Sequence, residues 1–123
     1  MSLTAYQRTR TITETARSTE RRLMMQITGD LIAARDAGQS GVALTPALFR
    51  NREVWSAFTS ACAARGNQLP DPVRASIVSL GLWVDRHTSE VAAGREGIDP
   101  LIEVNRTIIE ALHEGSAATL PVR

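Results

Sequence analysis

Cysteine is nearly missing from this chain of 123 residues and lysine is wholly missing, since Cys62 is the single cysteine and all 14 basic residues are arginine. One cysteine excludes an intrachain disulfide and a cysteine-rich zinc site. No apolar run approaches the roughly 20 residues that a membrane-spanning helix needs, and the first 22 residues lack the apolar segment of a secretory signal. We therefore expect a cytoplasmic protein without a membrane span.

Residues that carry catalysis are equally scarce. The chain has two histidines, His87 and His113, which share no metal-ligand spacing with Cys62. Its glycines form no phosphate-binding loop. Because catalysis needs a nucleophile or a metal with positioned acid–base partners, we expect no enzyme, no cofactor and no bound metal. His113 is expected in the last turn of a helix, where a positive charge complements the helix dipole.

Helical periodicity dominates what is present. Apolar residues recur at spacings of three and four, and no segment alternates with the period of two that a half-buried strand requires. Capping residues, prolines and glycines divide the chain into four predicted helices, over about residues 19–37, 45–65, 71–93 and 99–114. The sequence therefore predicts an all-α fold with four main helices in a bundle-like array.

The two ends of the chain differ in composition from its middle. Residues 1–16 are rich in threonine and predict a polar N-terminal arm, with Ser18 capping the first helix. Residues 17–114 predict a single helical domain, and residues 115–123 predict a flexible C-terminal tail. Thr45 is expected to cap the second helix, because a proline follows it at the first helical position.

Charge is distributed unevenly along the chain. The first 22 residues carry five arginines and two glutamates, an excess of +3, whereas the remainder carries an excess of −2. Positive charge permits binding to nucleic acid, but only Tyr6 is available in this segment for stacking on a base. Direct RNA binding is therefore not expected, and the arginines are interpreted as a solvated helix start.

Two features predict how the helices meet. Gly81 stands in the middle of the third predicted helix, at a cost of ~1 kcal/mol relative to alanine, and a close helix crossing would explain it. Asn105 stands near the centre of the apolar face of the fourth helix, where its amide needs hydrogen-bond partners. We predict that Asn105 bonds to Asn51 or to His87, and that these three polar residues have a structural role.

Five apolar residues lie off the main core faces of the predicted helices: Met25, Ile32, Phe49, Val78 and Leu82. Such residues can pack against a second neighbouring helix in the bundle. They can also form a groove that binds an amphipathic helix of a partner, and the pair Met24-Met25 suits such a surface because thioethers repack easily. Both interpretations stay open, and the five residues are our candidate partner-binding positions.

The chain resembles the FlaF family of alphaproteobacterial flagellar regulators. Three segments carry the resemblance, in this order: STERRLMMQITGDLIAARDAG, ALFRNREVWSAFTSACAARGNQLPDPVRASIVSLGLWVDRHTSEV and LIEVNRTIIEAL. The resemblance covers about residues 1–114. Its most specific stretches are Asn51-Arg52 followed by Trp55, the run from Ile77 to Thr88 with Trp83, and Asn105 before Ile108. It implies a helical, chaperone-like protein that binds flagellin, is needed for flagellin production and export, and works with or against the regulator FlbT.

The expected function is therefore a flagellar biosynthesis regulator that binds flagellin and promotes its synthesis and export together with FlbT. The alternative is a post-transcriptional regulator that acts on flagellin mRNA directly or through FlbT. The resemblance implies neither enzymatic activity nor a cofactor.

Overall fold

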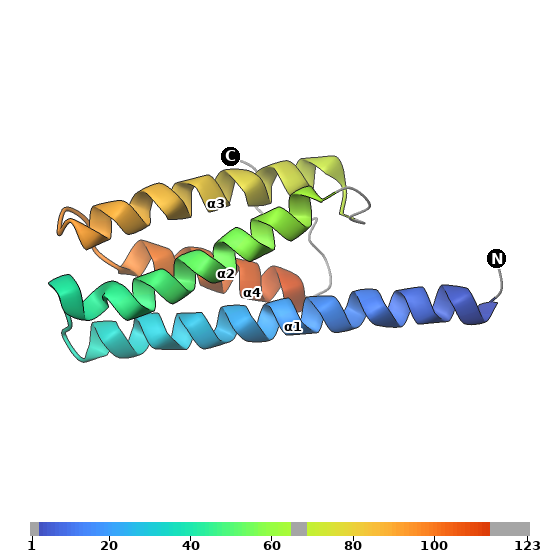
Figure 1. The fold of residues 1–123 in the computed structure, drawn as a ribbon, viewed down its shortest axis with the longest axis horizontal. Helices are drawn as coiled ribbons and strands as arrows, with labels where there is room; N and C mark the ends of the chain where they lie inside the picture. Colours follow the sequence, from blue (N-terminus) through green and yellow to red (C-terminus); the bar gives the residue numbers. More distant parts are fainter. Residues whose placement is uncertain (1–2, 65–68, 114–123) are drawn as a thin grey trace.

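The computed structural model describes residues 3–64 and 69–113, without the side chains of residues 6–17 and 113 (Figure 1). This part of the chain is helical and contains no strand, which confirms the predicted all-α bundle. Its elements are α1 (Leu3–Asp36), the short 3-10 helix η1 (Gly41–Leu44), α2 (Thr45–Ala63), α3 (Asp71–Ala92) and α4 (Asp99–His113). The predictions for the side chain of His113 and for the tail over residues 115–123 lie outside the described residues.

The helices are arranged so that one pair stays poorly packed. Helix α1 packs along both α2 and α4, and α2 packs along α3, whereas α3 and α4 touch at few positions (Figure 1). The order around the bundle is therefore α4, α1, α2, α3. Three interhelix seams are closed, and the seam between α3 and α4 is open.

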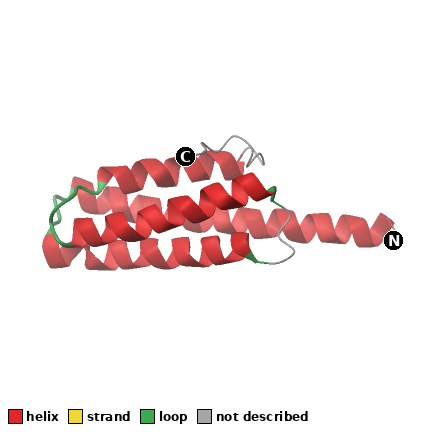
Figure 2. Ribbon diagram, turned by 90° about the horizontal axis from the view of Figure 1, so that it is seen from above, coloured by secondary structure: helices red, strands yellow, loops and turns green. Residues whose placement is uncertain are grey.

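The first helix begins earlier than predicted. We expected a start at Thr19 behind a Ser18 cap, but α1 begins at Leu3, so residues 3–16 belong to its first turns. The segment contains no proline or glycine before Gly29, so nothing interrupts the backbone hydrogen bonds at Ser18. Figure 2 shows the N-terminal part of α1 extending past the end of the other helices.

Glycines end two helices as predicted. Gly38 and Gly94 adopt positive φ angles of 66° and 76°, which favour glycine. Behind them, the N–H of Gln39 donates to the carbonyl of Ala34 at 3.0 Å, and the N–H of Arg95 donates to that of Glu90 at 2.9 Å. These are the bonds of Schellman caps. The prediction for Thr45 is wrong, because η1 runs directly into α2 and Thr45 is already helical (φ −52°, ψ −46°).

The core draws on all four helices. Its largest fully buried side chains are Met24, Leu31, Trp55, Ile77, Val84, Leu101, Ile102 and Ile108. The rings of Trp55 and Phe58 meet edge to face, with centroids 5.9 Å apart. Such pairs add about 0.5–1.5 kcal/mol beyond the burial of their area.

The predicted close crossing at Gly81 is present. A Cβ atom added to Gly81 of α3 would overlap with Cγ2 of Thr59 of α2. Thr59 is held there because its hydroxyl donates to the carbonyl of Trp55 at 2.8 Å. The missing side chain of Gly81 therefore lets α2 and α3 approach closely, which offsets the cost of glycine within a helix.

Candidate functional site

The open seam between α3 and α4 forms a groove of about 620 Å³. On α3 its lining includes Ser76, Ser79, Leu80 and Trp83. On α4 its lining includes Asp99, Pro100, Glu103, Val104 and Thr107. Most of these groups present carbon to the groove, so its chemistry suits an apolar side chain.

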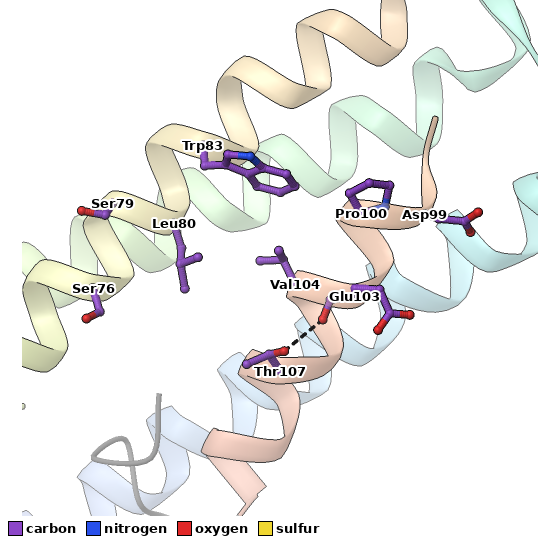
Figure 3. Close-up of a pocket in the computed structure, with 9 residues that line it drawn as sticks. All are labelled: Ser76, Ser79, Leu80, Trp83, Asp99, Pro100, Glu103, Val104 and Thr107. Atoms are coloured by element: carbon purple, nitrogen blue, oxygen red, sulfur yellow. Dashed lines mark hydrogen bonds between the residues drawn. The ribbon is translucent and has the colours of Figure 1, made fainter. Parts of the chain in front are cut away.

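The lining residues follow helical spacing on both walls. Ser76, Leu80 and Trp83 stand at i, i+4 and i+7 on α3, and Pro100, Val104 and Thr107 repeat this spacing on α4. In Figure 3, Leu80 and Val104 point toward one another, and the indole of Trp83 lies toward Pro100. The groove is therefore bounded by two parallel ridges, the shape into which a third helix packs.

The polar groups of the groove are mostly occupied or turned away. The hydroxyl of Ser76 donates to the carbonyl of Pro72 at 3.0 Å, and that of Thr107 donates to the carbonyl of Glu103 at 3.1 Å. The carboxylates of Asp99 and Glu103 point away from α3, on the outer side of α4 (Figure 3). The groove therefore has an apolar interior, and its two carboxylates are neutralised by ion pairs, Asp99 with Arg35 at 3.0 Å and Glu103 with Arg106 at 3.2 Å.

His87 connects Trp83, at one end of the groove, to the loop before α4. Its ring stacks on that of Trp83, with centroids 4.7 Å apart and an interplanar angle of 14°. Its Nε2 lies 2.9 Å from the carbonyl oxygen of Gly97. Our prediction placed His87 on the apolar seam beside a hydrogen-bond partner; the structure gives it a half-buried position on the groove's edge.

A buried polar network joins α2 to α4. The indole N–H of Trp55 donates to Oδ1 of Asn105 at 2.7 Å, and Nδ2 of Asn105 donates to Oδ1 of Asn51 at 2.7 Å. Of the two partners expected for Asn105, the structure therefore places Asn51 in contact and His87 elsewhere. Nδ2 of Asn51 is buried and has no partner among the described residues. The network fixes the register of α4 against α2.

Ion pairs connect the closed seams. Arg50 pairs with Asp30 between α2 and α1 at 3.0 Å, and Arg52 pairs with Asp85 between α2 and α3 at 2.6 Å. Arg35 of α1 pairs with Asp99 of α4 at 3.0 Å, and hydrogen bonds to Asp99 and then Asp36 raise the pKa of Arg35. In the described part of the chain, no such pair joins α3 to α4.

The five candidate partner-binding residues are spread over three helices. Met25, Phe49 and Leu82 are 47%, 59% and 58% exposed, whereas Ile32 and Val78 are half-buried. Val78 and Leu82 together line a hollow between α2 and α3, and Ile32 packs against the core. The structure therefore brings two of the five together and keeps Met25 and Ile32 on α1.

Leu80, Trp83 and Val104 were not among the candidates. Leu80 and Val104 fall on the apolar faces of their helices, and both are half-buried against the core. The repeated i, i+4, i+7 spacing on two consecutive helices indicates which residues lie on one face of each helix. Nothing in that spacing indicates that the two helices stay apart.

Two kinds of feature are absent from the described residues. No group of three or more histidine, cysteine or carboxylate side chains there is placed to hold a metal ion. None of the helices in residues 3–64 and 69–113 combines the length and apolar character needed to cross a membrane.

The described residues form an all-helical bundle with an open apolar groove between α3 and α4. The family model described as flagellar protein FlaF matches residues 2–112. Since this match covers most of the chain, the protein belongs to the FlaF family, which confirms the resemblance seen in the sequence. No curated protein and no solved structure matches the chain.

Proposed function

We propose that this flagellar protein binds flagellin and, in a chaperone-like manner, promotes its synthesis and export together with the regulator FlbT. The observation that carries the proposal is the open apolar groove between α3 and α4 in a member of a flagellar family. A groove between two helices is a common way to hold the apolar face of a partner helix. The cytoplasm, where flagellin is made, is the compartment that this function requires.

The size of the groove suits reversible binding. Burial of several hundred Å² of apolar surface at ~25 cal/mol/Å² gives a gross stabilisation of order 10 kcal/mol before the costs of association. The costs of association, at least about 4 kcal/mol, leave about 6 kcal/mol or less, which corresponds to a dissociation constant of tens of micromolar or weaker. Such an affinity shields an apolar helix and still permits its release for export.

We also propose that the protein acts by binding rather than by catalysis. No histidine or cysteine is among the residues that line the groove. The hydroxyls of Ser76 and Thr107 are engaged with carbonyl groups of their own helices. The groove therefore offers surface to a partner and lacks a nucleophile with an adjacent base.

The test measures binding of purified flagellin to the wild-type chain and to two variants. Ser79→Trp fills the groove from an exposed position of α3 and should lower flagellin affinity by about tenfold, or 1.4 kcal/mol. Met25→Asp combined with Leu82→Asp alters the other exposed apolar residues and should leave the affinity unchanged. Circular dichroism checks that both variants are folded.

Three results are informative. Loss of binding only in Ser79→Trp supports the groove, and loss only in the double variant assigns binding to the exposed ridges instead. Absence of flagellin binding by the folded wild-type protein refutes the proposed function.

A second candidate function is control of flagellin mRNA, directly or through FlbT. The observation that favours it is the N-terminal part of α1, which extends past the bundle and belongs to a segment of net charge +3 (Figure 2). Direct phosphate contact predicts that affinity for flagellin leader RNA falls steeply as salt rises. A flat salt dependence, or no retention on that RNA, would exclude direct binding.

A further inference from the structure

Buried polar side chains are shared among all four long helices. The described part of the chain buries five of them: Thr28, Asn51, Ser76, Thr88 and Asn105. Thr28 lies on α1, Asn51 on α2, Thr88 on α3 and Asn105 on α4. These four are at most 5% exposed. Each helix therefore places at least one polar side chain in a core that is otherwise apolar.

Thr28 stands at the same level of the bundle as the two asparagines. Helix α1 runs antiparallel to α2 and to α4 (Figure 1), and Asp30 pairs with Arg50. Thr28 precedes Asp30 by two residues and Asn51 follows Arg50 by one, so their levels differ by about 1.5 Å. The ion pair between α1 and α4 brings Asn105 equally close to the level of Thr28.

Thr88 of α3 belongs to the same level. Helices α2 and α3 also run antiparallel (Figure 1), and Arg52 pairs with Asp85. Asn51 precedes Arg52 by one residue and Thr88 follows Asp85 by three, so their levels differ by about 3 Å, less than one helical turn. The four residues therefore form one polar layer across the bundle: Thr28, Asn51, Thr88 and Asn105.

The two asparagines meet across the centre of the polar layer. Helices α2 and α4 stand on opposite sides of the bundle, because the order around it is α4, α1, α2, α3. Nδ2 of Asn105 nevertheless donates to Oδ1 of Asn51 at 2.7 Å. The amide pair thus spans the centre, and the helices that carry Thr28 and Thr88 flank it on its two sides.

Hydrogen bonding in the polar layer is incomplete at one donor. Nδ2 of Asn51 is buried and has no partner among the described residues. The hydroxyls of Thr28 and Thr88 each donate at 2.6 Å to a carbonyl of their own helix, those of Met24 and Val84. Each hydroxyl oxygen keeps lone pairs that can accept. Buried polar groups without a protein partner are commonly satisfied by ordered water.

We propose that the polar layer binds one internal water molecule. The water accepts a hydrogen bond from Nδ2 of Asn51 and donates to a threonine hydroxyl of the layer, that of Thr28 on one side or Thr88 on the other. A water-mediated bond joins polar groups that lie too far apart for direct contact. This site goes beyond the proposed function, since it concerns how the four helices are held together.

NMR on the isotopically labelled chain tests for the water directly. The side-chain amide protons of Asn51 should show a rotating-frame Overhauser effect to water, with the sign of dipolar contact rather than of proton exchange. Absence of this effect overturns the inference. So does a high-resolution crystal structure in which Nδ2 of Asn51 bonds directly to a threonine oxygen.

Thermodynamic cycles test the bridge, because valine keeps the shape of threonine and removes its oxygen. One of Thr28→Val and Thr88→Val should raise the unfolding equilibrium constant about tenfold in the wild-type chain and less than about twofold in Asn51→Leu. Thr107→Val is the matched control, since Thr107 makes the same bond to its own helix but lines the groove. Its effect should be the same in both backgrounds.

The outcomes of the cycles are distinct. A larger effect of one threonine variant in the wild-type background supports the water and identifies the threonine that it contacts. Effects of both variants that are unchanged by Asn51→Leu overturn the inference. The NMR measurement needs no substitution, so it decides the question if Asn51→Leu does not fold.

Discussion

The two sides of α3 meet their neighbours in different ways. On the side of α2, Gly81 removes a side chain where Thr59 approaches, and Arg52 pairs with Asp85 at 2.6 Å. On the side of α4, Trp83 stands opposite Pro100, and a groove of about 620 Å³ remains. One helix therefore takes part in a tight seam and an open one.

The comparison shows that apolar character alone does not close an interhelix seam. The side toward α4 carries Leu80 and Trp83, which are more apolar than the glycine on the side toward α2. Distance between helices depends on the volume of the side chains at the crossing, since interiors pack to a uniform density. On the side toward α4, the apolar side chains of α3 line a groove instead of packing against the neighbouring helix.

We expect the largest effect on stability at Asn105, which holds α4 to α2. Its hydrogen bonds matter because α4 has few contacts with α3. Asn105→Ala leaves the indole N–H of Trp55 and Oδ1 of Asn51 buried without their present partner. We expect a loss of about 3 kcal/mol in the free energy of unfolding, measured by urea denaturation. Thr107→Ala on the same helix serves as the control, with a loss below about 0.5 kcal/mol. A loss under about 1 kcal/mol for Asn105→Ala would show that other contacts hold α4.

The close packing of α3 against α2 can be disrupted and restored at Gly81. Gly81→Ala should lower the free energy of unfolding by about 1–2 kcal/mol, because overpacking against Thr59 exceeds the gain in helix propensity. In a Thr59→Ser background, which removes Cγ2 and keeps the hydroxyl, Gly81→Ala should instead stabilise by about 0.5–1 kcal/mol. Equal effects in the two backgrounds would refute the steric explanation.

The open seam between α3 and α4 can be tested at the end of the groove that Trp83 lines. His87→Ala removes the ring stacked on Trp83 and the contact with the carbonyl of Gly97. We expect a loss of about 1 kcal/mol in stability and a red-shifted emission of Trp83, as its ring gains contact with water. His87→Phe keeps the stacking and should keep the emission. Unchanged emission in His87→Ala would mean that Trp83 is positioned by other groups.

The smallest effect concerns an ion pair near the loop between α3 and α4. The hydrogen bonds from Arg95, at 2.7 and 3.1 Å, lower the pKa of Glu90. A lowered pKa in the folded state means that the pair stabilises the fold above the ordinary glutamate value of 4.5 and loses this effect as the pH falls below it. The difference in melting temperature between wild type and Glu90→Gln should therefore shrink on acidification. A difference that grows at low pH would contradict this sign.

Much of the fold was predictable because its signals are local. Gly38 and Gly94 end their helices, and the pair Asp99-Pro100 begins α4, as their conformational preferences require. Ser18 did not predict the start of α1 correctly. A residue with a capping side chain marks the start of a helix only where the residues before it are not helical. Nothing in residues 3–17 disfavours a helix strongly enough to force that end.

The candidate site was predictable only in part. Asn105 in an apolar stripe needs a buried partner, and this need pointed correctly to the second helix and Asn51. The exposure of Met25, Phe49 and Leu82 agrees with their position off the core faces. The groove itself escaped prediction, because Leu80 and Val104 have the pattern of ordinary core residues.

The amino-acid sequence by itself determined four amphipathic helices, most of their ends and the family, because periodicity and capping act within a few residues. Only the tertiary structure decided which pair of helices stays apart. That outcome depends on how side chains of different helices, such as Trp83 and Pro100 on the two walls of the groove, fit together when the bundle packs.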